Sequence, residues 1–187
     1  GAINNSGEIA AGSFDIKSAT LNNSGSLLQT GSGKLAIDSS QLLNKQGGII
    51  GQDLYADAST PPSMPPSKTP PTTANNGSSV GTDDNSQPSE PNPTPLPSVT
   101  RDGSINVNNL TNTGSIYSNG KINVAADSMA NQNKSSLAVS TLDIADNGSA
   151  SNTDSRLQLD QIDWQLVNFD NSKGQIITSG GIALDVN

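Results

Sequence analysis

Apolar and polar residues alternate in short runs along most of this chain. Clear examples are Leu35-Ala36-Ile37 and Ile122-Asn123-Val124, each of which follows a Gly-Lys pair. A period of two places alternate side chains on one face of a β-strand, and no segment keeps the 3.6-residue period of an amphipathic helix. The pattern therefore predicts an all-β chain of short strands over residues 1–58 and 101–187.

A longer unit contains these strands and returns roughly every twenty residues. It reads apolar-x-Asn-x-Gly-x-apolar, then a few polar residues with glycine, then apolar-x-apolar, and Leu21–Leu27 is a clear copy. Successive asparagines are 18 residues apart from Asn5 to Asn23, and the 37 residues from Asn131 to Asn168 correspond to two coils of a degenerate copy. We predict that one asparagine marks the same corner of each coil: Asn5, Asn23, Asn44, Asn112, Asn131 and Asn168.

Short strands that recur at this spacing between Gly and Asn turns predict a parallel β-helix, or solenoid. Asn and Gly suit the corners because they tolerate left-handed backbone angles, and stacked asparagines can form an amide ladder. One coil buries about five aliphatic side chains at about 1.5–3 kcal/mol each, while ordering its residues costs about 1–2 kcal/mol apiece. Stability therefore depends on neighbouring coils of the same chain. The side chains expected to stack inside are Ile9, Phe14, Ile16, Leu27, Leu35 and Ile37.

The prolines divide the chain into three parts. All eleven lie between Pro61 and Pro97, in a Pro/Ser/Thr/Asn-rich run over residues 59–100 that contains few apolar side chains. Because proline cannot donate to a sheet ladder, this run cannot belong to the wall of the β-helix. We predict a flexible insertion looped out between the coils of residues 1–58 and those of residues 101–187. It is either a tolerated spacer or a ligand segment for a partner.

Composition and charge narrow the function classes. Only 31% of the residues are hydrophobic and 3% aromatic, which fits a narrow aliphatic core. The net charge of −8 argues against binding to nucleic acid or to anionic membranes. No apolar run approaches the roughly 18–20 residues of a membrane helix, so no membrane insertion is expected. The chain contains no cysteine, opens without a signal peptide and begins in mid-pattern, which suggests an excerpt from a longer exported protein.

The unit Leu-x-Asn-x-Gly-x-Leu/Ile followed by Gly-x-Leu-x-Ile resembles the filamentous haemagglutinin repeat. That repeat builds two-partner-secreted exoproteins, among them adhesins and the carriers of contact-dependent growth-inhibition toxins. The resemblance covers about residues 3–58 and 101–187. It implies a right-handed β-helix shaft, exported through an outer-membrane transporter partner and displayed on the bacterial cell surface. The insertion and the degenerate coil, with its polar excursion over residues 147–155, depart from the repeat.

We therefore expect a structural and adhesive shaft segment that presents binding or toxin domains and mediates attachment to other cells. The alternative is a receptor-binding segment, in which the insertion or the degenerate coil contacts a target-cell or host receptor or glycan. A third hypothesis is that the chain is a β-helix enzyme that degrades polysaccharides. It rests on Asn152-Thr153-Asp154, which echoes a fragment of a pectin-hydrolase pattern whose other acidic, His and basic parts are missing.

No catalytic centre, metal site or cofactor is expected. The chain has no His and no Cys, which removes the usual general base and thiol nucleophile. The acidic pair Asp83-Asp84 lies in the insertion and is interpreted as solvated. Three aromatic residues are candidate surface contacts: Tyr55, Tyr117 and Trp164. Both tyrosines alternate with inward neighbours and should face outward, whereas Trp164 shares a strand face with Ile162 and Leu166 and is better explained as a core residue.

Overall fold

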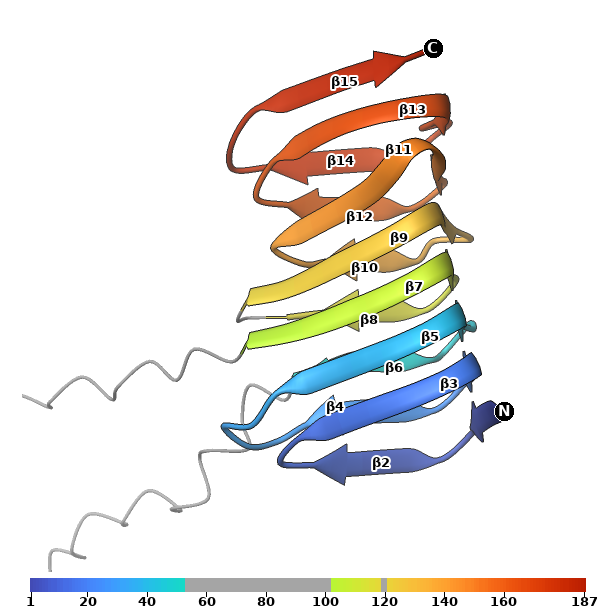
Figure 1. Ribbon diagram of the computed structural model, residues 1–187, viewed down its shortest axis with the longest axis vertical. Helices are drawn as coiled ribbons and strands as arrows, with labels where there is room; N and C mark the ends of the chain where they lie inside the picture. Colours follow the sequence, from blue (N-terminus) through green and yellow to red (C-terminus); the bar gives the residue numbers. More distant parts are fainter. Residues whose placement is uncertain (53–101, 119–120) are drawn as a thin grey trace, which may run out of the picture. The chain divides into compact units, whose positions relative to one another are not determined.

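The computed structural model describes residues 1–52, 102–118 and 121–187, which form two parallel sheets (Figure 1). An eight-stranded sheet contains the strands β1 (Ala2–Asn5), β3 (Phe14–Asn23), β5 (Leu35–Asn44), β7 (Asp102–Asn112), β9 (Lys121–Gln132), β11 (Thr141–Thr153), β13 (Ile162–Asp170) and β15 (Ile182–Val186). A seven-stranded sheet contains β2 (Glu8–Ala11), β4 (Ser26–Gln29), β6 (Ile49–Gln52), β8 (Ser115–Tyr117), β10 (Ser136–Ala138), β12 (Arg156–Leu159) and β14 (Gln175–Thr178).

The strands follow the chain in strict alternation between the two sheets, so each coil contributes one strand to each sheet. Every pairing is parallel, and the stack comprises about seven turns without a helix in the described residues. In Figure 1 the near strands run to the right and the far strands to the left as the chain climbs, which is a right-handed winding. The predicted all-β parallel solenoid is confirmed.

The coils on both sides of residues 53–101 belong to one stack. Strand β5 pairs with β7 from Leu35↔Gly103 to Asn44↔Asn112, and β6 pairs with β8. The register therefore continues as if the intervening residues were absent. The predicted insertion over residues 59–100 lies outside the described residues.

The core is a narrow stack of aliphatic side chains between the two sheets. Leu21, Leu42 and Leu110 align in one column and are at most 1% exposed. Leu27, Leu35 and Ile37 are buried as expected, while Phe14 and Ile16 are partly buried. Ile9 is an exception because it is 44% exposed. It faces inward in β2, the last strand at its end of the sheet, where no further coil covers it.

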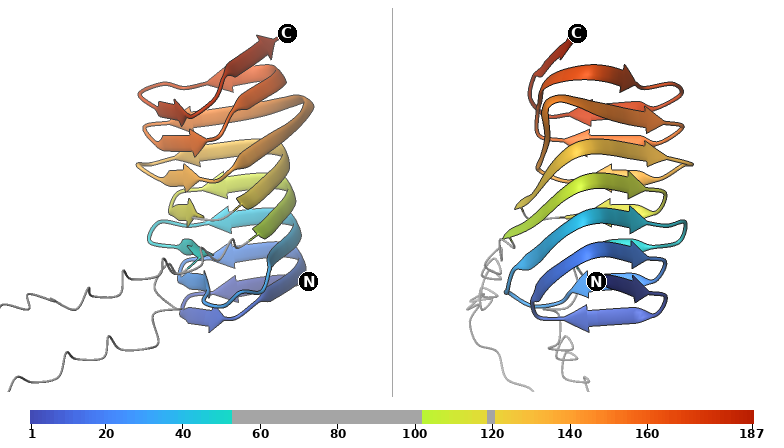
Figure 2. Two further views of the ribbon diagram at one scale, coloured as in Figure 1. Left: turned by 90° about the vertical axis from the view of Figure 1, so that its left-hand side faces the viewer. Right: turned by 45° about the vertical axis from the view of Figure 1, so that its right-hand side comes forward.

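Each long strand bends at a position that pairs with nothing. Residues Ala19 in β3, Ser40 in β5 and Asp127 in β9 are skipped by the register, while their neighbours pair on both sides. Figure 2 shows these strands curving around the stack. In β11 the same position holds the four residues 145–148, since Ile144 pairs with Ala126 and Ser149 pairs with Ser128. This four-residue bulge is the largest departure from the repeat among the described coils.

Candidate functional site

The most regular polar feature is a column of asparagines at the corner that follows each long strand. Each Nδ2 donates to the Oδ1 of the asparagine one coil further on, and all six of these N–O distances are 2.8 Å. Six of the seven members are at most 8% exposed. The members of this asparagine ladder are Asn5, Asn23, Asn44, Asn112, Asn131, Asn152 and Asn171.

The second Nδ2 hydrogen of each ladder member closes the corner. Asn44 donates to the backbone carbonyl of Ser115 at 3.1 Å, and Asn112 donates to that of Ser136 at 3.0 Å. Both acceptors begin the short strand of the following coil. The ladder thus links coil to coil and also ties the long strand of one coil to the short strand of the next. A buried amide in this position is fully satisfied, which is the condition under which a polar interior group stabilises a fold.

Glycine completes the corner because there is no room for a side chain. A Cβ on Gly25 would collide with the carbonyl oxygen of Gly7, and one on Gly114 would collide with that of Gly48. The glycine of Asn-x-Gly is thus needed for close approach between successive coils. Two later coils place a buried serine here instead, and the Ser135 hydroxyl donates to Asn131 Oδ1 at 2.7 Å.

The ladder corrects one of the predicted corner residues. Five of the six are members: Asn5, Asn23, Asn44, Asn112 and Asn131. Asn168, in contrast, is exposed and pairs with Ser149 within strand β13, before the corner. The corner of that coil is Asn171, because the inward residue two positions before the asparagine is Phe169 and not Leu166. Asn152 was missed because only Ala150 precedes it at that position. In place of the 37-residue interval to Asn168, the ladder steps 21 residues from Asn131 to Asn152 and then 19 residues from Asn152 to Asn171.

The aromatic candidates differ in their surroundings. Tyr55 lies outside the described residues. Tyr117 is half-buried on the outer face, and its ring lies so close to Gly51 that a Cβ there would be 2.9 Å from Cζ. Trp164 is not a surface contact, because only 2% of it is exposed and it packs edge-on against Phe169 at 6.1 Å between ring centroids.

Trp164 also compensates for the bulge. Its Nε1 donates to the Leu142 carbonyl oxygen at 2.7 Å. In the described structure the pairing of β11 with β13 begins only at Gly148↔Leu166, at the last residue of the bulge. The indole N–H thus satisfies a backbone acceptor of β11 in the stretch where this ladder is missing.

A second buried polar group lies at the end of β6, where the described chain stops at Gln52. Gln52 Nε2 donates to Gln29 Oε1 at 3.0 Å, and the Ser118 hydroxyl donates to Gln52 Oε1 at 2.7 Å. Both glutamines are fully buried. In two later coils the same column is apolar, with Val139 and Leu159 buried in place of the polar group.

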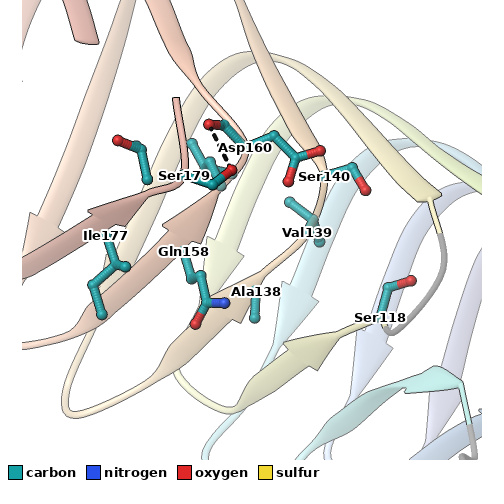
Figure 3. Close-up of a pocket in the computed structure, with 10 residues that line it drawn as sticks. Ser118, Ala138, Val139, Ser140, Gln158, Asp160, Ile177 and Ser179 are labelled. Atoms are coloured by element: carbon teal, nitrogen blue, oxygen red, sulfur yellow. Dashed lines mark hydrogen bonds between the residues drawn. The ribbon is translucent and has the colours of Figure 1, made fainter. Parts of the chain in front are cut away.

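The outer surface carries shallow hollows. One, of about 280 Å³, lies where short strands lead into the following coil, and Figure 3 shows its hydroxyl and carboxylate groups. The Ser179 hydroxyl donates to the Asp160 carbonyl oxygen at 3.3 Å, and Ser140 lies nearby. No Lys or Arg side chain lines this hollow, and the chain has no histidine. Its lining therefore offers hydroxyl groups and the carboxylate of Asp160.

A larger hollow of about 450 Å³ lies beside the bulge and is acidic, with Asp38, Asp127 and Asp143 in its lining. Asn108 Nδ2 donates to Asp127 Oδ2 at 3.0 Å. No group of three or more acidic residues in the described part of the chain is arranged to hold a metal ion.

One carboxylate at the ladder corner has a shifted pKa. The Ser172 hydroxyl and then its backbone N–H donate to Asp170, and Thr153 adds a weaker bond. These bonds favour the charged form and lower the pKa of Asp170 below its usual value, against a smaller opposing effect of desolvation. Asp170 thus closes the turn before Asn171 as an anionic acceptor.

Fold and site together define a parallel β-solenoid with an internal asparagine ladder. Comparison with protein-family models found no match, and neither did comparison with curated proteins or with solved structures. Within the described residues, no helix has the length and hydrophobicity to cross a membrane.

Proposed function

We propose that this chain is a structural and adhesive shaft segment of a large secreted bacterial surface filament, which presents binding or toxin domains to other cells. The observation that supports it most is the asparagine ladder, which runs through the coils on both sides of residues 53–101 with an N–O distance of 2.8 Å at every step. A set of hydrogen bonds that is repeated from coil to coil stabilises the whole stack and not one local site. The resemblance to the filamentous haemagglutinin repeat adds the surface location and the transporter-dependent export.

A shaft must resist being pulled apart along its axis, and the coil interface suits that task. Between two neighbouring coils, nine residues of β3 pair with β5 and four residues of β4 pair with β6. Their hydrogen bonds run along the stack and carry an axial load together. Each coil adds only about 4.8 Å of length, which is the distance between neighbouring strands. The stack is therefore stiff, but it gains little length per residue.

The absence of cysteine is consistent with export as an unfolded chain, because no premature disulfide can form. Coils can then fold one onto the next as they emerge, since each needs only its neighbour. On this proposal the partners are an outer-membrane transporter during export and a receptor or glycan on the target cell.

Single-cysteine labelling tests the location. Asn106 is exposed on β7, and its neighbour Ile105 is fully buried. In the producing bacterium, a membrane-impermeant maleimide should label N106C on intact cells, and deletion of the transporter should abolish that labelling. The matched variant I105C should react only after denaturation. Labelling of N106C only in broken cells would contradict the proposal.

The bulge supports a second candidate, a receptor-binding segment. Asp146 and Asn147 are exposed, and Asn147 has a left-handed φ of 63°. These residues protrude from a wall that is otherwise regular, beside the acidic hollow. Deleting residues 146–148 keeps Ala145 as the bend residue and should abolish binding to target cells if the bulge is the contact. Unchanged binding would remove this candidate.

A further inference from the structure

We propose that Asn147 deamidates spontaneously in the folded protein and becomes a mixture of isoaspartate and aspartate. The four-residue bulge in β11 places this exposed asparagine directly before Gly148. The Asn147 side-chain amide makes no hydrogen bond to another described residue. The inference does not depend on the proposed function, because it rests on the geometry of the bulge alone.

The reaction needs only the Asn-Gly pair and water. The main-chain nitrogen of Gly148 attacks Cγ of Asn147, so that a new N–Cγ bond forms, the Cγ–Nδ2 bond breaks, and ammonia leaves with the proton of the Gly148 nitrogen. Water then opens the resulting cyclic imide. Opening at Cγ gives aspartate, whereas opening at the main-chain carbonyl carbon gives isoaspartate, in which the main chain runs through Cβ and Cγ. Ring closure is favoured when the attacking nitrogen belongs to glycine, because no Cβ obstructs it.

The bulge gives the main chain the freedom that ring closure requires. The nitrogen must swing toward the side chain, and hydrogen bonds to both neighbouring strands would oppose this rotation. Residues 145–147 pair with neither β9 nor β13, and Gly148 pairs with Leu166 alone. Asn147 has a left-handed φ of 63°, a conformation that asparagine tolerates better than most residues. The bulge therefore exposes Asn147 to water and restrains its main chain less than a regular bend does.

The fold also requires the glycine. A Cβ on Gly148 would collide with the carbonyl oxygen of Asp127 in β9 and would lie 2.8 Å from that of Ala145. Only glycine fits so close an approach to neighbouring main chain. The residue that makes Asn147 reactive is thus fixed by the packing of the bulge against β9.

The ladder asparagines provide the contrast. Asn23, for example, is fully buried, precedes Ser24 and donates from Nδ2 to the Ile49 carbonyl oxygen at 3.0 Å as well as to the next ladder member. Buried and bonded amides of this kind should remain intact. Two further Asn-Gly pairs, Asn76-Gly77 and Asn119-Gly120, lie outside the described residues.

The product changes the surface and not the core. Conversion adds a carboxylate next to Asp146 and beside the acidic hollow, whose lining includes Asp127 and Asp143. Isoaspartate also adds one atom to the main-chain path. The register already jumps from Ile144 to Ser149 here, so the bulge takes up that atom without shifting the pairing that follows. The stack should therefore stay folded while its outer surface becomes more acidic.

Peptide mapping by mass spectrometry tests the proposal on the 187-residue chain, incubated at neutral pH and sampled over time. Asn147 should convert in the folded protein within about tenfold of its rate in the guanidinium-unfolded chain, a barrier difference of at most about 1.4 kcal/mol. Asn23 should react only after unfolding. Methylation by an isoaspartyl methyltransferase identifies the isoaspartate. Survival of the Asn147 amide in the folded protein, while the unfolded chain reacts, would overturn the proposal.

N109G provides the matched control, because it creates the same Asn-Gly pair at the regular bend of β7. Asn108 is exposed, but its Nδ2 donates to Asp127 Oδ2 at 3.0 Å, and residue 109 pairs with both Gln41 and Ser128. In the folded variant, Asn108 should react at least about tenfold more slowly than Asn147, and after unfolding the two should react alike. Equal rates in the folded variant would overturn the inference, because the dipeptide alone and not the bulge would then determine the reactivity.

Thermal unfolding followed by circular dichroism checks the effect on the fold. Fresh and aged wild type should unfold at the same temperature. So should fresh and aged N147Q, whose longer side chain closes the ring much more slowly. A lower midpoint in aged wild type alone would show that the bulge does not take up the added atom.

Discussion

The coils before Lys121 and the coils after it share one architecture, but the corners and bends of the earlier coils are more regular. The earlier coils turn through Asn-x-Gly corners or a glycine-rich variant, and their bends hold a single residue. All five non-glycine residues with a left-handed φ in the described chain lie in the later coils: Asn133, Lys134, Asn147, Asp154 and Lys173. The bulge and the buried serines of the corner also lie there. The later coils therefore carry most of the local strain.

Much of the interior is nevertheless shared by both regions. The ladder distance is 2.8 Å whether the asparagines are 18, 19 or 21 residues apart. Most inward columns stay apolar, and only the sizes of their side chains change, as when Met129 and Ala150 follow Leu110. The buried pair Gln29 and Gln52 is the exception, since Val139 occupies that column in a later coil. Interior positions are bonded and packed from both sides, so they tolerate little change. Corners and bends face solvent and need only to connect strands, so the repeat varies there.

The largest effect is expected at Trp164, a core residue that lies beside the bulge in β11. W164A should lower the free energy of unfolding by about 3–5 kcal/mol, because it leaves a cavity and an unpaired Leu142 carbonyl. Urea unfolding followed by circular dichroism measures the loss. A cost below about 1 kcal/mol would show that the indole does not support the gap between β11 and β13.

A double-mutant cycle then tests whether the bulge is the reason for the tryptophan. Isoleucine occupies comparable inward positions in earlier coils, for example Ile37 and Ile105. W164I should be destabilising in the native chain and should cost less than about 1 kcal/mol once residues 146–148 are deleted, since the two sites are coupled. If the changes in the free energy of unfolding caused by W164I and by the deletion simply add, the bulge is not the reason for the tryptophan.

Breaking the ladder in a regular coil should cost about 3 kcal/mol. N112L removes an acceptor for Asn44 and a donor for Asn131, and it leaves the Ser136 carbonyl unpaired in the interior. Chemical unfolding compares it with N22L, whose Nδ2 bonds to Asn4 on the exposed face. That control should stay within about 0.5 kcal/mol of wild type. Equal effects at both positions would mean that the internal ladder contributes no more than a surface pair.

The corner strain gives a smaller effect of opposite sign. Lys173 has a φ of 58°, a conformation that costs an ordinary residue about 1–2 kcal/mol and glycine nothing. K173G should therefore stabilise the protein by about 0.5–1 kcal/mol after the entropic cost of glycine. Lys45 occupies an earlier corner without a left-handed φ, so K45G should be neutral or destabilising. Thermal unfolding ranks the two variants, and stabilisation by both would exclude relief of strain as the cause.

The same contrast explains how far the sequence could predict the molecule. The corner motif is complete within adjacent residues in the regular coils, as in Leu21-Asn22-Asn23 and Leu110-Thr111-Asn112. The coil length, the strand faces and five ladder positions could therefore be predicted from local sequence. Asn152 and Asn171 could not be predicted, because Ala150 and Phe169 stand where the regular copies have leucine or isoleucine. The bond from Trp164 to Leu142 follows from the bulge. The position of the bulge in β11 is set by the pairing of that strand with the neighbouring coils and not by any local sequence pattern.

The smallest effect is a pKa shift at an irregular corner. S172A removes the hydroxyl that contributes most to lowering the pKa of Asp170, so that pKa should rise toward its usual value. Because the folded-state pKa is the lower one, the interaction stabilises the fold above the ordinary carboxylate range and is lost as pH falls through the folded value. Wild-type protein should therefore lose this contribution on acidification and S172A should show less of that loss. NMR titration of the Asp170 side chain in wild type and in S172A measures the shift, and an unchanged Asp170 curve would assign the effect to groups other than Ser172.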